Sequence, residues 1–301
     1  MTKLPHFLLI GAARSGTTAI HSYLRQCPLV FLPRAKEPNF FAYEGMELAV
    51  RGPGADYINN AVTRIEDYAA LFAPAPAGAI LGEASPLYLF EPRAAERIHH
   101  HVPKARLIAV LRNPIEQAWS HFMYASKQSI ETEPDFTRAL AMEEERLAQG
   151  WQPLFGYSRF PAYADQMERY FMRFSREQIM VRLYEDLEAD AGKLMAEIFA
   201  FIGVTSGFVA DTGEKLNAGG VPKNRALQDF LMKSNPVTRA IGLVVPQDLR
   251  WRLRDRLARM NVRRVEGGMP EQARAVLRDR LGDQIRRLEP MIGRDLSHWL
   301  A

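Results

Sequence analysis

The chain opens with an apolar run that breaks into a glycine-bounded loop, and this feature constrains the fold most. Residues 7–11 are Phe-Leu-Leu-Ile-Gly, and Ala-Ala-Arg-Ser-Gly-Thr-Thr follows them. A buried strand that turns through such a loop into a helix is typical of phosphate-binding α/β folds. The phosphate-binding pattern G-x-x-x-x-G-K-[ST] is kept at Gly11, Gly16 and Thr18, but Thr17 stands where the lysine belongs. The stretch therefore predicts an anion site that differs from that of a nucleoside triphosphatase.

Short apolar runs with the length and flanks of buried parallel strands recur along the chain. Their bounds are 7–11, 79–82, 106–111 and 179–184. Helical patterns separate them: one follows Gly16 and stops before Pro28, and two others cover 163–174 and 187–202. Because strands and helices alternate, we predict an α/β fold, a P-loop-like three-layer sandwich with a central parallel sheet and helices on both faces.

The length and composition suit one large domain. With 301 residues, 47% of them hydrophobic, the chain can bury a sizeable core, and we predict a single domain over 1–301. Proline and glycine cluster within about 40–78, which predicts loops and short helices there. Residues 204–224 predict a long surface loop. The part from about 225 to 301 is arginine-rich and helical, and an apolar stripe over 277–288 predicts packing.

The composition argues against several classes of protein. A single cysteine, Cys27, excludes an internal disulfide and a cysteine metal cluster. No apolar run approaches the roughly 18 residues of a membrane span and no signal sequence opens the chain, so we expect a cytoplasmic protein. The net charge of +4 favours anionic ligands without pointing to nucleic acid. The adjacent histidines at 99–101 would point in different directions on a helix, so we predict no metal site.

Two groups of side chains are candidates for binding anions. Around Gly16, backbone N–H groups and the positive end of a helix dipole converge, and Arg14 can take two oxygens of an anion. In the second group, Arg112 follows a strand, and Ser120 comes after Pro114 has started a helix. The alternative is structural: the glycines can form a tight connection beside an exposed Arg14, and Arg112 can be a surface charge.

Three further stretches stand in the order and at the spacing of one enzyme family. They are KEPNFF at 36–41, GEASPLYLF at 82–90 and LIAVLRNPIEQAWSHF at 107–122. With these motifs the chain resembles the sulfotransferases that use 3′-phosphoadenosine 5′-phosphosulfate (PAPS). It is most similar to bacterial members of the branch that includes the heparan sulfate sulfotransferases. The similarity extends to LEPMIGRDLSHWL at 288–300 and covers nearly the whole chain.

The resemblance implies where the donor PAPS binds. The first loop of the family holds the 5′-phosphosulfate, a second element holds the 3′-phosphate, and a late loop closes over that phosphate. The matching residues here are Arg14, Ser15, Gly16, Thr17 and Thr18 in the first loop, Arg112 and Ser120 in the second element, and Lys223, Asn224 and Arg225 in the late loop. Transfer in this family needs no metal, so a lysine that helps to organise magnesium has no role.

The resemblance also implies how the reaction is catalysed. Glu37 matches the glutamate that serves as base in heparan-type relatives, whereas Glu83 follows a strand and is a candidate for orienting or binding the substrate. Which of the two is the base stays open. Arg14 stands at the position of the family's loop lysine, and Lys36 lies beside the proposed base. Both are candidates for stabilising the charge that develops during transfer.

Two departures from the family leave the acceptor unassigned. Ala84 stands where heparan-type enzymes often have a lysine, and Asn39 stands where they often have a histidine. We expect a small-molecule, lipid or glycan acceptor, sulfated on a hydroxyl or, as the less favoured choice, on an amine. It would be covered by the loops of about 40–78 and by the C-terminal helices.

A basic stretch over 249–264 carries seven arginines and a helical apolar stripe. It predicts an amphipathic helix with a solvated basic face; the alternative is a face that attracts an anionic acceptor or rests on the inner membrane surface. Two other classes of function stay open: a P-loop kinase-like phosphotransferase, which the missing lysine disfavours, and a non-catalytic anion- or membrane-binding protein. We expect no nucleic-acid partner, and the sequence indicates no oligomeric state.

Overall fold

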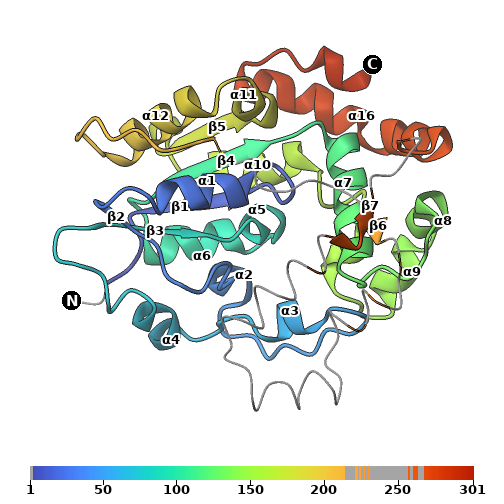
Figure 1. The fold of residues 1–301 in the computed structure, drawn as a ribbon, viewed down its shortest axis with the longest axis horizontal. Helices are drawn as coiled ribbons and strands as arrows, with labels where there is room; N and C mark the ends of the chain where they lie inside the picture. Colours follow the sequence, from blue (N-terminus) through green and yellow to red (C-terminus); the bar gives the residue numbers. More distant parts are fainter. Residues whose placement is uncertain are drawn as a thin grey trace.

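A parallel sheet forms the centre of the fold. The computed structural model describes residues 3–213, 221–222, 224, 227, 230, 257, 260–263 and 268–301. The strands of the sheet are β1 (Phe7–Gly11), β2 (Val30–Phe31), β3 (Ile80–Ala84), β4 (Arg106–Leu111) and β5 (Ile179–Leu183). They lie in the order β2-β3-β1-β4-β5, and every neighbouring pair is parallel (Figure 1).

Helices connect the strands and continue to the C-terminus. The α-helices are α1 (Thr17–Leu24), α2 (Phe40–Tyr43), α3 (Asp56–Asn59), α4 (Ile65–Ala70), α5 (Leu87–Phe90), α6 (Ala94–His101), α7 (Pro114–Lys127), α8 (Phe136–Ala141), α9 (Glu143–Ala148), α10 (Tyr163–Phe171), α11 (Tyr184–Ala189), α12 (Ala191–Ile202) and α16 (Glu271–Ile292). Short 3₁₀ helices are η1 (Pro153–Phe155), η2 (Arg176–Gln178) and η3 (Ser297–Leu300). A separate antiparallel pair is formed by β6 (Val221–Pro222) and β7 (Val262–Arg263).

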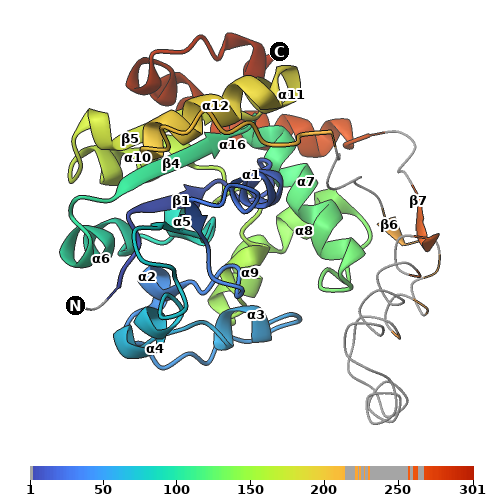
Figure 2. The same cartoon turned by 60° about the vertical axis from the view of Figure 1, so that its left-hand side comes forward.

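Two hydrophobic cores lie on opposite faces of the sheet. Along β1, Leu8 and Ile10 belong to one core, and Phe7 and Leu9 belong to the other, because successive side chains of a strand point to opposite faces. The first core includes side chains of α5 and α6, and the second includes side chains of α1 and α12. Figure 2 shows α12 on one side of the sheet and α5 and α6 on the other. The predicted three-layer α/β fold is thus confirmed.

A third core joins the C-terminal helix to the rest of the protein. Leu277 and Leu281 of α16 are buried with side chains of α7 and α8, and Ile285 and Leu288 continue the same stripe into the first core. The apolar stripe predicted over 277–288 is therefore a packing surface. Among the described residues, no helix combines the length and the apolar composition needed to cross a bilayer.

Some sequence-based boundaries were wrong. The helix predicted over 187–202 is two helices, because Asp190 begins a new one: its carboxylate accepts a hydrogen bond from the Lys193 N–H at 2.8 Å. Tyr184, predicted as the end of a strand, is the first residue of α11. The loop predicted over 204–224 contains the short strand β6. Most of the basic stretch 249–264 lies outside the described residues.

Gly82 tests the fit between β3 and β1. It pairs with Phe7 across the two strands, and a Cβ at position 82 would overlap the Phe7 ring. We therefore expect Gly82→Ala to lower the free energy of unfolding by about 1–3 kcal/mol, as overpacked core sites do. In α12, a Cβ at Gly192 would only approach Asp190 Oδ1, at 3.4 Å, so Gly192→Ala should change stability by less than about 1 kcal/mol. Urea unfolding measures both, and a Gly82→Ala protein as stable as the wild type would contradict this packing.

Candidate active site

The loop between β1 and α1 lies at the carboxyl edge of the sheet, where ligands bind in open α/β folds. Gly16 precedes α1 with a φ of 82°, a left-handed conformation that favours glycine. A Cβ at this position would also collide with the Leu187 side chain. The first N–H groups of α1 have no acceptor within the helix, so this end of α1 attracts an anion.

Two arginines from neighbouring strand ends meet beside this loop. The Arg14 Nε lies 3.4 Å from the Ser120 Oγ, and an Arg112 guanidinium nitrogen lies 3.4 Å from the Arg14 carbonyl oxygen. Burial lowers the pKa of the Arg14 guanidinium below its usual value, and the nearby charge of Arg112 acts in the same direction. The structure therefore brings together three residues that the sequence placed in an anion site, and two close positive charges suit an anionic ligand.

Each arginine lies over a tyrosine ring that sequence reasoning did not single out. The Arg14 guanidinium is 4.5 Å from the centre of the Tyr124 ring, and the Arg112 guanidinium is 4.8 Å from that of Tyr184. Such cation–π contacts orient the guanidinium groups. Tyr124 could have been found from the sequence, because it follows Ser120 by four positions and therefore lies on the same face of α7.

A carboxylate with two donors lies on the other side of the loop. The Lys36 ammonium is 2.8 Å from Glu37 Oε1 and also donates to the Thr18 hydroxyl at 2.8 Å. The Tyr57 hydroxyl donates to Glu37 Oε2 at 2.6 Å. The Glu37 side chain is 22% exposed, so a ligand can reach it. Lys36 thus links the start of α1 to the proposed base, and Tyr57 of α3 holds the second oxygen.

A buried network supports the backbone that carries this carboxylate. Glu37 and Asn39 both have positive φ angles, 58° and 55°, a conformation that needs outside support in residues with side chains. The Asn39 N–H donates to the Ser85 hydroxyl at 3.1 Å, and that hydroxyl donates to Glu83 Oε1. Tyr68 donates to the other Glu83 oxygen at 3.3 Å. Glu83 therefore lies beneath the loop, a position that suits the orienting role suggested for it.

Burial sets the charge state of this supporting carboxyl. Glu83 is 1% exposed, and burial raises its pKa to about 7 even though hydrogen bonds from Ser85 and neighbouring tyrosines act in the opposite direction. A side chain so deeply buried does not meet an acceptor molecule in this conformation. Glu37 is the carboxylate at the surface of the site.

The remaining predicted residues differ in how they are placed. The Ser15 side chain is fully buried, and its hydroxyl donates to the Ala13 carbonyl at 3.5 Å. Thr17 is buried, whereas Thr18 is exposed. The Asn224 side-chain oxygen accepts the Leu227 N–H at 3.0 Å. Lys223 and Arg225 lie outside the described residues.

No group of three or more His, Cys, Asp or Glu side chains is placed to hold a metal ion within the part of the chain that the structure describes.

Comparison with known proteins assigns the family. Residues 5–207, more than half of the chain, match the model of the sulfotransferase family. The chain therefore belongs to this family, as its motifs indicated. Membership implies a sulfuryl donor such as PAPS.

A solved relative shares the whole fold. The crystal structure of a sulfotransferase from Alicyclobacillus acidocaldarius is 29% identical, with a TM-score of 0.73 over 99% of this chain and 100% of that one. The human bifunctional heparan sulfate N-deacetylase/N-sulfotransferase 3 is 26% identical over 218 residues, which cover 67% of this chain and 22% of that protein. Mouse carbohydrate sulfotransferase 15 is 25% identical over 244 residues, 66% of this chain and 44% of that protein. The chain thus spans about a fifth of the length of the first of these curated relatives.

The buried Glu83 predicts a pH-dependent loss of stability. In the folded protein this carboxyl keeps its proton up to a pKa of about 7, whereas in the unfolded chain it releases the proton near the ordinary glutamate pKa of 4.5. Between these values the unfolded state binds fewer protons, so stability falls as pH rises, by about 3 kcal/mol in total for this group. Glu83→Gln lacks this titration. Urea unfolding from pH 4.5 to 8 should show the free energy of unfolding of the wild type falling by that amount relative to the variant. Equal pH dependence of the two proteins would contradict this prediction.

Proposed function

We propose that this sulfotransferase uses PAPS and transfers its sulfuryl group to a hydroxyl, or as the less favoured choice an amine, of a glycan, lipid or natural product. The observation that carries the proposal is the convergence of Arg14 and Arg112 at the N-terminus of α1, beside the Lys36–Glu37 pair. The loop between β1 and α1 is thus bordered by positive groups, which suit a donor with two anionic groups, and by a carboxylate that can serve as base.

The donor site follows from the two arginines. PAPS supplies an activated sulfuryl group on its 5′-phosphate and carries a second anion, the 3′-phosphate. The N-terminus of α1, with Thr18 and Arg14, would bind the 5′ end. Arg112 and Ser120 would bind the 3′-phosphate, and Lys223 and Arg225 of the late loop would complete this side. Because guanidinium and ammonium groups supply the positive charge, we propose that the reaction needs no metal.

Glu37 is the proposed base. A base accepts the acceptor proton through a free oxygen lone pair, and Lys36 at present covers Oε1 while Tyr57 covers Oε2. Lys36 has a second partner, the Thr18 hydroxyl at the start of α1. We propose that Lys36 moves toward the sulfuryl oxygens when both substrates bind, which frees Oε1 for the acceptor proton while Tyr57 keeps the carboxylate oriented.

The acceptor site has an aromatic rim. Tyr57 is 37% exposed and Tyr124 is 39% exposed, and their polar contacts join them to Glu37 and Arg14 respectively. Flat, partly exposed rings bind the apolar faces of sugars and of aromatic compounds. The names of the human and mouse relatives, a heparan sulfate N-sulfotransferase and a carbohydrate sulfotransferase, favour a glycan. A role of 249–264 in binding this acceptor or a membrane stays a proposal.

Calorimetric titration tests the donor. We expect 3′-phosphoadenosine 5′-phosphate (PAP), the product of the donor, to bind with micromolar affinity and equally well with and without magnesium. Removal of a charged hydrogen-bonding partner in Arg112→Ala should weaken binding about 10- to 100-fold. Tighter binding of magnesium–ATP than of PAP would favour a kinase-like phosphotransferase. Binding of PAP without transfer to any hydroxyl or amine would favour a non-catalytic protein.

Tyr57→Phe tests the orientation of the base. In the absence of another acceptor, water takes the sulfuryl group and leaves as sulfate. Loss of the phenol should lower the rate of this ³⁵S-sulfate release from labelled PAPS by about 10- to 100-fold without changing the affinity for PAP.

Tyr43→Phe is the control for this variant: it removes a tyrosine hydroxyl that is buried and has no hydrogen-bond partner among the described residues. An unchanged rate in Tyr57→Phe would show that Tyr57 does not orient Glu37.

A further inference from the structure

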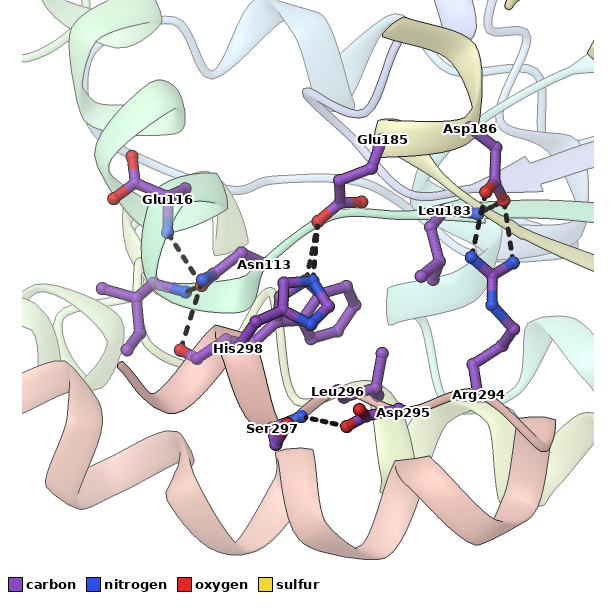
Figure 3. A network of polar contacts seen from close by, with 12 residues as sticks. Asn113, Glu116, Leu183, Glu185, Asp186, Arg294, Asp295, Leu296, Ser297 and His298 are labelled. Carbon is purple, nitrogen blue, oxygen red and sulfur yellow. Dashed lines mark hydrogen bonds and ion pairs between the residues drawn. The ribbon is translucent and has the colours of Figure 1, made fainter. Parts of the chain in front are cut away.

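The chain after α16 folds back onto the sheet. Gly293 ends α16 with a φ of 63°, and residues 294–300, which we call the C-terminal strap, then lie against the ends of β4 and β5 (Figure 3). Leu296 and Trp299 of the strap are 0% and 1% exposed. The strap lies outside the residues 5–207 that match the family model.

The strap binds the first turn of α11, which follows β5 directly. We call this turn and the two residues 112–113 between β4 and α7 the strand-end segments. Arg294 makes two hydrogen bonds to the Asp186 carboxylate, at 3.0 and 2.9 Å. The same carboxylate accepts the Leu183 N–H at 2.8 Å, which fixes the turn from β5 into α11. The Trp299 indole N–H donates to Glu185 Oε1 at 2.7 Å. Figure 3 shows these partners side by side on the first turn of α11.

The strap also binds the loop that follows β4. The Trp299 carbonyl oxygen accepts a hydrogen bond from the Asn113 amide at 3.2 Å. The Asn113 side-chain oxygen in turn accepts the Ile115 N–H at 2.9 Å and begins α7. A single buried residue, Trp299, therefore contacts both strand-end segments. Its indole binds the segment after β5, and its backbone carbonyl binds the segment after β4.

Each of the two strand-end segments carries one partner of a contact in the candidate site. Arg112 directly precedes Asn113, and Tyr184 directly precedes Glu185. The contact between the Arg112 guanidinium and the Tyr184 ring, at 4.8 Å, thus depends on the relative position of the strand-end segments after β4 and β5. The hydrogen-bonded pairing of β4 and β5 ends at Leu111 and Leu183, immediately before the two strand-end segments. Beyond this point the contacts of the strap hold the two segments beside each other.

We infer that the C-terminal strap, through Trp299, is a positioning element for the 3′-phosphate side of the donor site. It holds the strand-end segments that carry Arg112 and Tyr184 at a fixed separation, so the guanidinium is oriented before the nucleotide binds. Binding then loses less conformational entropy. This inference rests on the proposed PAPS donor. It predicts that damage to the strap weakens recognition of the 3′-phosphate and not of the 5′-phosphate.

The test compares two nucleotides that differ only in the 3′-phosphate. Calorimetry gives the ratio of the dissociation constants of AMP and PAP, which isolates the contribution of that phosphate. Trp299→Phe keeps an aromatic ring in the buried position and removes the indole N–H. We expect the ratio to fall roughly tenfold, as for loss of an oriented charged contact, while AMP affinity stays near that of the wild type.

A second variant and a matched control separate positioning from stability. Arg294→Gln removes the bonds to Asp186 without touching the buried core, and it should lower the same ratio. Arg287→Gln on α16 breaks exposed ion pairs with Asp165 and Glu168, at 2.6 and 3.3 Å. None of these residues belongs to a strand-end segment, so this control should leave the ratio unchanged. Thermal unfolding of all three variants reports their stability.

Each outcome decides the inference. A lower ratio in Trp299→Phe and Arg294→Gln with unchanged AMP affinity supports it. An unchanged ratio, or an equal loss of AMP and PAP binding, overturns it and leaves the strap as a purely structural segment. A wild-type protein that binds PAP no better than AMP overturns the proposed donor itself, and with it the role assigned to the strap.

Discussion

The proximity of two positive charges, Arg14 and Arg112, is the constraint on which the rest of the site depends. Guanidinium groups that lie close together in a partly buried place repel each other, and the depressed pKa of Arg14 reflects its burial and this neighbour. The protein supports both groups with the rings of Tyr124 and Tyr184. An anionic ligand relieves the repulsion that remains. Two supported positive groups suit the proposed donor, which carries more than one negative charge.

The candidate base depends on contacts from distant parts of the chain. Its second oxygen is held by Tyr57, and the chain just before that tyrosine is fixed by backbone hydrogen bonds between residue 51 and residues 150 and 152, at 2.9 and 3.0 Å. Below the same loop, Glu83 reaches the backbone of Asn39 through Ser85. The geometry of one carboxylate thus combines segments that are more than 100 positions apart.

The sequence allowed the grouping of Arg14, Arg112 and Ser120 to be predicted. The strand over 7–11 and the glycine loop after it have strong local signals in the sequence. Arg112 follows a second strand, and Ser120 lies on the helix that begins two residues later, so both lie at the same end of that strand. The carboxyl ends of parallel strands lie at the same edge of the sheet, however many residues separate the strands in the sequence. The depth of side chains was less predictable: Ser15 and Glu83 are both buried.

Contacts between segments without periodic patterns could not be predicted. Tyr57 lies on a four-residue helix, 20 positions from its partner Glu37, and no spacing rule links the two. Trp299 resembles an ordinary core aromatic in the sequence, and its two polar contacts appear only when the strap folds back. Asp190 divides a helix because its side chain caps a new one, although the apolar pattern continues across it.

A crystal structure of the protein with bound PAP tests the central claim most directly. The account predicts the 5′-phosphate at the N-terminus of α1 beside Thr18 and the 3′-phosphate between Arg112 and Ser120, with Glu37 facing the open side of the 5′-phosphate. A nucleotide bound elsewhere, or one whose 3′-phosphate points into solvent away from Arg112, would contradict it.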